Sequence, residues 1–336
     1  MNLRHALTLV LFASMLPFSA HAVQRAYVSA VSGNDTNTAT GCAATAPCRW
    51  FAGAITVVDP GGEIVAMDTG AYGALTITKS ISIVAAPGVY AGISVFGGNG
   101  ITIATAGINV ALRGLTINSM GASTHGIHMT NGAKLTIEHC VISNFSSSSY
   151  AGLFVTNGAK VGVAHSTFRD NFDGMVFSKG AIASIADSVL AGNTNYGVWV
   201  TDTYGSASEI TTVDVARSVI YGSSVGVNVF NTTAGRTSRA FVSDSSIFGN
   251  YSGVQAYASA GTGHATASHN RIHGNGFGLS ASDVSGHLIA TGNTVTKNFY
   301  GLSQSGTAVF ESAADNVVRD NATANSDGTI TPFAKM

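Results

Sequence analysis

Titratable side chains recur between residues 139 and 269 at intervals of 22 to 30 residues. They are His139, His165, Asp187, Arg217, Asp244 and His269, and we call them the charged row. Only 10% of the residues of the chain are Asp, Glu, Lys or Arg, so this alignment stands out. Acidic and basic groups in one line could exchange protons with a ligand, or could form a polar track along an extended polymer. The alternative is a solvated face on which alternating charges avoid like-charged neighbours.

A second set of side chains, Phe154, Val176 and Trp199, recurs at the same spacing, and we call it the aromatic stripe. An apolar patch on the outside of a protein usually marks a contact surface. It could stack on sugar rings, dock a partner, or lie beneath a covering loop, for which residues 201–209 are the candidate. The candidate ligand-binding residues are therefore Phe154 and Trp199 of the stripe, with the three histidines of the charged row.

Both sets belong to an internal repeat that must position them. An apolar residue stands three positions after each member of the charged row. These residues are Ile142, Phe168, Leu190, Ile220, Ile247 and Ile272, with Ile117, Val295 and Val318 in flanking repeats. Three positions further on, most repeats carry asparagine, namely Asn171, Asn193, Asn250, Asn275, Asn298 and Asn321. A glycine then opens the next strand. Self-similarity at this period indicates a solenoid.

The repeat contains short alternating strands and no helical pattern, so it must coil with like strands paired in parallel, about 4.8 Å apart. We predict an all-β parallel β-helix of about ten or eleven coils. The apolar column should fill its core. The asparagine column should stand at corners where φ is positive, with its amides bonded from turn to turn.

The pattern over roughly residues 47–321 resembles the right-handed β-helix family of secreted bacterial proteins, which includes pectate lyases and polygalacturonases. The resemblance implies a right-handed coil. It also implies that the apolar stripe Trp50, Phe51, Ala54, Ile55 and Val58, ended by Pro60-Gly61, is an N-terminal capping helix.

The resemblance also suggests catalytic candidates. The corner Asn171-Phe172-Asp173-Gly174 is similar to the polygalacturonase corner that carries a catalytic carboxylate. Glycoside hydrolysis needs two positioned carboxylates, and the equivalent position one turn later is Tyr196. Pectate-lyase chemistry needs acids that hold Ca²⁺ and a basic residue, which Asp187, Asp244 and Arg217 imitate without the local motifs of the family. A Ca²⁺ cofactor is therefore expected only of a lyase, and no other cofactor is predicted.

A dedicated metal site is not predicted. His139, His165 and Asp187 offer ligand atoms, but they stand on three successive turns. The outer two are then about 9.6 Å apart at the backbone, whereas the ligands of one metal ion lie about 2 Å from it.

The N-terminal segment predicts export. Residues 1–22 have a basic start, a short apolar run and a small-x-small site at Ala20-His21-Ala22, which is typical of a signal peptide. Residues 23–60 then hold the capping segment, 61–321 the β-helix and 322–336 a polar tail, with no membrane span in the mature chain. In an oxidising compartment, Cys42 and Cys48 should form a disulfide and leave Cys140 free and buried.

Composition limits the partners. The net charge of −1 provides no basic surface for nucleic acid. The first hypothesis is a secreted or periplasmic, non-catalytic protein that presents a long surface to a polysaccharide or a cell-surface glycan. The second is a lyase or hydrolase of acidic polysaccharides. The sequence leaves both open.

Overall fold

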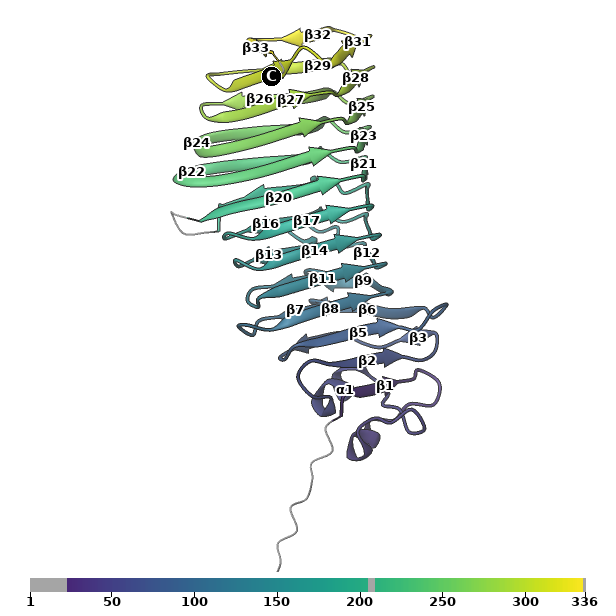
Figure 1. Cartoon of the computed structure of the whole chain (residues 1–336). Helices are drawn as coiled ribbons and strands as arrows, with labels where there is room; N and C mark the ends of the chain where they lie inside the picture. Colours follow the sequence, from purple (N-terminus) through teal and green to yellow (C-terminus); the bar gives the residue numbers. More distant parts are fainter. Residues whose placement is uncertain (1–22, 205–208, 335–336) are drawn as a thin grey trace, which may run out of the picture.

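The computed structural model describes residues 23–204 and 209–334, and the signal-peptide prediction for 1–22 lies outside this range. The chain coils as a parallel β-helix with three faces (Figure 1). The expected solenoid is confirmed, because the strand pairs of consecutive coils are parallel across the described residues, with register shifts only in the β6–β9 and β22–β24 pairs. One face forms a sheet of 11 strands, which agrees with the ten or eleven coils expected.

Each face takes one strand from each coil. The first face contains β2 (Gly62–Ala66), β5 (Ile81–Ala85), β8 (Asn109–Arg113), β11 (Lys134–Glu138), β14 (Lys160–Ala164), β17 (Ile182–Ala186), β20 (Ile210–Ala216), β27 (Gly286–Thr291), β30 (Val309–Ala313) and β33 (Ile330–Phe333). The second contains β3 (Gly70–Ala71), β6 (Ala91–Gly98), β9 (Leu115–Ser123), β12 (Val141–Ser143), β15 (Thr167–Arg169), β18 (Val189–Ala191), β21 (Val219–Tyr221), β23 (Ser246–Phe248), β25 (Arg271–His273), β28 (Thr294–Thr296) and β31 (Val317–Arg319). The third contains β4 (Leu75–Ile77), β7 (Ile101–Ile103), β10 (Ile127–Met129), β13 (Ala151–Thr156), β16 (Asp173–Ser178), β19 (Tyr196–Thr201), β26 (Phe277–Asp283), β29 (Tyr300–Gln304) and β32 (Ala324–Asp327).

Two long strands join the third face to the first. β22 (Val225–Ser243) and β24 (Ser252–Ser268) run from one face to the other and pair with each other along most of their length. Residues 231–239 interrupt the spacing of the repeat, yet they are part of β22, because β24 supplies a partner strand for them.

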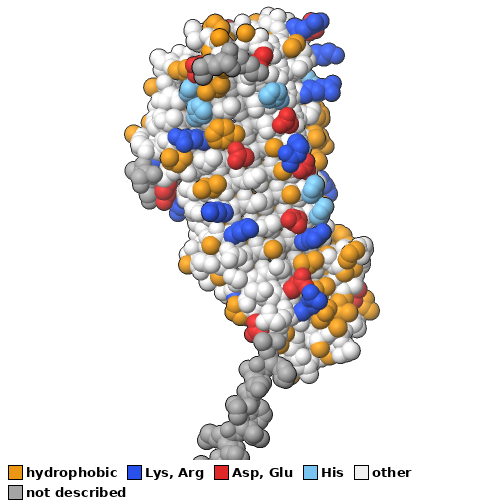
Figure 2. Space-filling model, in the orientation of Figure 1, with side chains coloured by type: hydrophobic (Ala, Val, Ile, Leu, Met, Phe, Trp, Pro, Cys, Tyr) orange, Lys and Arg blue, Asp and Glu red, His pale blue; other side chains and the backbone are white. Residues whose placement is uncertain are grey.

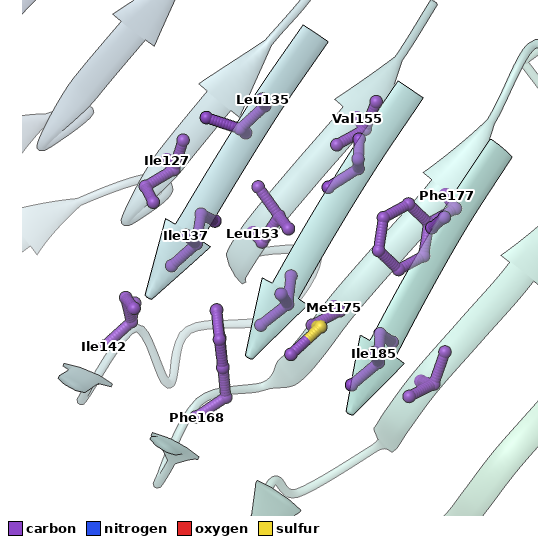
Figure 3. Close-up of a cluster of buried hydrophobic side chains, with 14 of the residues drawn as sticks. Ile127, Leu135, Ile137, Ile142, Leu153, Val155, Phe168, Met175, Phe177 and Ile185 are labelled. Atoms are coloured by element: carbon purple, nitrogen blue, oxygen red, sulfur yellow. The ribbon is translucent and has the colours of Figure 1, made fainter. Parts of the chain in front are cut away.

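The core is the stack of inward side chains that the apolar column predicted. Figure 3 shows them meeting between the strands, among them Ile142, Phe168 and Ile185. Ile142, Phe168, Leu190, Ile220, Ile247, Ile272 and Val295 are all 0% exposed. Each occupies the register position of its neighbour one coil away, so the column is continuous.

Asparagine ladders fill the corners between the second and third faces. The Asn250 amide nitrogen donates to Asn275 Oδ1 at 3.0 Å, and Asn275 donates in the same way to Asn298 at 2.9 Å. The expectation of positive φ at these asparagines is wrong. Positive φ falls on the residue before each one, such as Asp170 at 58° and Gly249 at 64°, because the asparagine itself turns inward to bond the next coil.

The glycines that open the third-face strands are required by close approach of the backbone. A Cβ atom on Gly174 would lie 2.4 Å from the carbonyl oxygen of Gly197, and one on Gly197 would lie 2.5 Å from that of Gly226. The coils meet here without room for any side chain.

The N-terminal end carries β1 (Arg25–Val28), the 3₁₀ helix η1 (Asp35–Thr40) and helix α1 (Phe51–Val57). β1 pairs in parallel with β2, and α1 buries Phe51, Ala54 and Ile55 beside it. The Cys42–Cys48 disulfide is present, and Cys140 is free and buried, as expected. None of the described helices is long and apolar enough to span a membrane.

Candidate functional site

The charged row lies where the chain turns from the first face to the second. His139, His165, Asp187, Arg217, Asp244 and His269 all have φ between 47° and 55°, in the left-handed region. Asp and His are among the few residue types other than glycine that are enriched there. The tight turn therefore accounts for most of the residue types in the row. Figure 2 shows acidic, basic and histidine side chains along the right-hand edge of the molecule.

Members of the charged row contact one another. The rings of His139 and His165 stack with centroids 5.0 Å apart. Arg217 donates from Nε and Nη2 to both carboxylate oxygens of Asp187, at 2.9 and 2.8 Å. These hydrogen bonds lower the pKa of Asp187. A carboxylate held in this way is a poor proton acceptor, so the pair does not fit the acid–base role considered for it.

The row does not provide a cation site either. Among the described residues, no group of three His, Cys, Asp or Glu side chains is placed to hold one metal ion. Asp187 and Asp244 stand two coils apart, with Arg217 on the coil between them.

The aromatic stripe lies on a different side of the molecule. Phe154, Val176 and Trp199 pair in register on the outer side of β13, β16 and β19. The segment after β19 leads into β20, whereas the charged row follows the far end of β20. The stripe therefore lies on the third face, whereas the row stands at the corner between the first and second faces.

The stripe is partly covered, and it forms one wall of a hollow. Val176 is only 2% exposed, and Phe154 and Trp199 are half-buried. Tyr204, in the predicted covering segment, makes edge contacts with both rings, at 5.6 and 6.4 Å. The hollow has a volume of ≈ 200 Å³ and is lined by Ser149, Phe154, Phe172, Asp173, Val176, Asn195, Tyr196, Trp199 and Tyr204. We call it the Trp199 hollow.

Asp173 supplies the one ionisable carboxyl group of the Trp199 hollow. Its side chain is 2% exposed. Asn195 Nδ2 and the backbone N–H of Tyr196 donate to its Oδ1, at 3.0 and 3.3 Å, and neither contacts Oδ2. Burial raises the pKa of Asp173 to about 7, because the two hydrogen bonds only partly replace its hydration. Asp173 can therefore take up or release a proton near neutral pH.

Tyr196 occupies the position of Asp173 on the next coil. Burial and then the nearby Asp173 carboxylate raise the pKa of Tyr196, and the side chains of Asn195 and then Asn228 act in the opposite direction. Asn228 is 2% exposed, and its Oδ1 has no hydrogen-bond partner among the described residues. Trp199 Nε1 is likewise buried without one. Unpaired buried polar atoms are costly, so they are uncommon in a purely structural surface.

Two histidines that sequence reasoning had not selected as site residues border the hollow. The rings of His125 and His128 lie 4.7 and 5.2 Å from that of Phe154. His125 Nδ1 accepts from the Ala151 N–H at 3.1 Å. Burial, and then the neighbouring His128, lower the pKa of His125 to about 4, and burial also lowers the pKa of His128. Both are therefore uncharged at neutral pH.

A second hollow continues the same outer row toward the C-terminus. It has a volume of ≈ 150 Å³, and Tyr251, Gln255, Phe277, Ser280 and Ser303 are among its lining residues. Asn228, Gln255, Ser280 and Ser303 follow Trp199 in register, one on each coil. The third face thus carries two hollows in line along the coil axis.

Of the residues singled out from the sequence, the structure brings together Phe154, Trp199 and Asp173. It separates them from His139, His165, Asp187, Arg217, Asp244 and His269, which lie along the other corner. Tyr196, Asn195 and Tyr204 were not selected as site residues. The only sequence signal for Tyr196 is that it takes the place of Asp173 one coil later.

Comparison with known proteins agrees with the fold. Residues 88–239 match the family described as the right handed beta helix region. The structure resembles a pectate lyase with a TM-score of 0.64 at 17% identity, over 89% of this chain and 80% of the lyase. It also resembles an alginate lyase from Paenibacillus sp. str. FPU-7, with a TM-score of 0.52 at 15% identity, over 91% of this chain and 99% of that one.

The A-module of a mannuronan C-5 epimerase from Azotobacter vinelandii gives a TM-score of 0.51 at 15% identity, over 81% of this chain and 86% of the module. No curated protein matches the chain in sequence. The fold of this chain is thus a right-handed parallel β-helix, and at these identities the solved structures show the fold alone.

Proposed function

We propose that this protein is exported and binds an extended polysaccharide along the outer row of the third face, with the Trp199 hollow as the main contact. The observation that carries the proposal is the hollow itself. Its lining brings five aromatic rings, the amide of Asn195, the hydroxyl of Ser149 and one carboxyl group together on the surface of the solenoid. Aromatic faces stack on the apolar sides of sugar rings, while the polar groups bond their hydroxyls.

The geometry suits a polymer better than a single small molecule. The Trp199 hollow is smaller than the roughly 300 Å³ at the low end of drug-sized pockets, so it holds on the order of one sugar ring. The second hollow lies two to four coils beyond Trp199 in the same register row, at about 4.8 Å per coil. A chain of sugars laid along the coil axis would reach both.

Several findings support the polysaccharide class. The solved structures with this fold named above are a pectate lyase, an alginate lyase and a mannuronan epimerase. The Cys42–Cys48 disulfide fits an oxidising compartment, which is where such polymers occur.

A glycan array probed with the purified protein tests the proposal. Binding to at least one polysaccharide or oligosaccharide class is expected, and it should weaken in the variant Trp199→Ala. Gln255→Ala in the second hollow should weaken the binding of long chains while sparing short ones. An array without any bound glycan would contradict the proposal.

Catalysis is the second candidate, and the Asp173 carboxyl favours it. A group with a pKa of about 7 in a hollow is matched to proton transfer at neutral pH. No second carboxyl group lines the Trp199 hollow, which disfavours two-carboxylate hydrolysis and leaves proton abstraction from a sugar ring. An assay for unsaturated products on whichever polysaccharide the array identifies separates this candidate from simple binding, because Asp173→Asn should abolish turnover.

A further inference from the structure

Aromatic side chains form most of the walls of the Trp199 hollow. Five of its nine lining residues are aromatic: Phe154, Phe172, Tyr196, Trp199 and Tyr204. The other chemically distinctive group is the Asp173 carboxyl, and the described residues that line the hollow include no lysine, arginine or histidine. A ring of aromatic faces with one acid at its side is the arrangement that recognises organic ammonium groups, because the negative faces of the rings and the carboxylate attract the same cation.

The described residues that contact Asp173 include no positively charged group that would neutralise its carboxylate. Lining amides donate only to Oδ1 of Asp173, from Asn195 and from the Tyr196 backbone. The nearest histidines, His125 and His128, pack against Phe154 and are uncharged at neutral pH. Asp202 follows β19, but it is buried and accepts from Thr211. Asp173 therefore lacks the cationic partner that a buried carboxylate needs.

This electrostatic character disfavours a uronate in the hollow. A sugar carboxylate placed beside Asp173 would meet a like charge in a poorly hydrated space, with neutral rings as the other walls. A neutral sugar would avoid that repulsion and would leave Asp173 protonated. An ammonium group would bind more tightly than a neutral sugar. Its charge would favour the ionised form of Asp173, and it would pair with that carboxylate among the rings.

We propose that the Trp199 hollow binds a positively charged amino-sugar unit of its polysaccharide, with the sugar ammonium held between Asp173 Oδ2 and the rings of Trp199, Tyr196 and Tyr204. This rests on the proposed function, in that the third face is taken to bind a glycan. It assigns a ligand class opposite in charge to the pectate and alginate named in the similar structures.

Isothermal titration of the purified protein with four probes near about pH 6.5 tests the assignment. The probes are a β-linked glucosamine hexamer, the corresponding N-acetylglucosamine hexamer, a galacturonate hexamer and a lysine hexapeptide. We expect the glucosamine hexamer to bind at least about tenfold more tightly than each of the other three. Asp173→Asn should remove most of that preference, because the amide keeps the hydrogen bonds from Asn195 and Tyr196 but cannot pair with an ammonium.

Asp170→Asn is the matched control. Asp170 stands three residues away on the same corner, is exposed, and has φ of 58°, which asparagine also tolerates. It should bind all four probes like the unmodified protein. An unchanged or higher melting temperature of Asp173→Asn would show that its loss of binding is local.

The outcomes separate the inference from the proposed function. Equal or tighter binding of the acetylated or the uronate hexamer would overturn the ammonium assignment and leave the glycan-binding face intact. Equal binding of the lysine peptide would overturn the assignment to a sugar. If no oligosaccharide binds here or on the array, both the inference and the proposed function fail.

Discussion

Two outward rows of this solenoid look similarly promising in the sequence, yet they have different physical characters. The charged row stands in a tight turn, where its side chains reach solvent and contact one another. The Trp199 hollow is half-buried, holds a carboxyl with a raised pKa, and leaves Trp199 Nε1 without a hydrogen-bond partner among the described residues. Charged residues in a line can thus reflect what the backbone tolerates at a turn, whereas unmet polar groups beside aromatic rings indicate a binding site.

The difference extends to electrostatics. In the charged row, Arg217 and Asp187 satisfy each other, with 58% and 33% of their side chains exposed, and such pairs contribute little to stability. In the hollow, Asp173 has amide donors but no cation, so its ionisation is opposed by burial. A ligand can therefore gain more by contacting the hollow than by contacting the row.

The largest effect should come from the core beneath the row. Ile247→Asp places a charge in a column that is 0% exposed and packed from both neighbouring coils, so it should cost at least about 4 kcal/mol or prevent folding. Asp244→Asn, three residues earlier in the charged row, should change stability by roughly 0.5 kcal/mol or less. Urea denaturation of both variants measures this. Similar losses in the two would show that the row is not a solvated turn.

The next effect is a pH dependence of stability that comes from the hollow. Asp173 has a pKa of about 7 against an ordinary value of 3.8, so between these pH values the folded chain binds more protons than the unfolded chain. Its contribution to stability is then present below about pH 4 and lost as the pH rises through 7. Between the two ends of this pH range, the contribution of Asp173 to the free energy of unfolding changes by roughly 4 kcal/mol.

Asp173→Asn should therefore stabilise the protein at about pH 8 by up to this roughly 4 kcal/mol and change little at about pH 4. Thermal or urea unfolding at the two pH values measures it. Asp170→Asn, which removes an exposed carboxylate from the same corner, should not show this pattern. Equal effects of the two variants at all pH values would mean that Asp173 is hydrated.

A smaller effect concerns binding. Trp199→Ala should weaken binding of the glycan identified on the array by about 10- to 100-fold, as expected of a central aromatic contact. Phe241→Ala is the control, because Phe241 is an aromatic residue 40% exposed on the part of β22 that lies in the first face. Titration calorimetry gives both affinities. A loss of binding in Phe241→Ala alone would move the site to the first face.

The smallest effect should come from the row itself. Arg217→Ala removes an exposed guanidinium that contacts Asp187 at a distance from the hollow, so it should not change affinity or specificity measurably. A selective loss of acidic glycans in this variant would restore the charged row as a second binding surface.

The sequence alone determined the coil. A β-helix stacks each residue on its equivalent one coil away, so a column in the alignment of repeats is also a column in space. The inward apolar column and the asparagine ladder could be predicted for that reason. The Cys42–Cys48 disulfide could be predicted from two cysteines six residues apart in a chain expected to be exported. The residue before each asparagine carries the positive φ because the hydrogen bond to the next coil, which no repeat pattern displays, directs the asparagine inward.

Only the tertiary structure decided which outward residues meet. Repeat alignment orders residues along the coil axis, but it does not say how far apart two columns lie around the coil. It could not show that the charged row stands at the corner between the first and second faces while the aromatic stripe lies on the third face. Nor could it show that Tyr204, from a segment outside the repeat, comes to lie against Phe154 and Trp199. The environment of Asp173 depends on these contacts, since burial by neighbouring coils, and not the identity of the residue, raises its pKa.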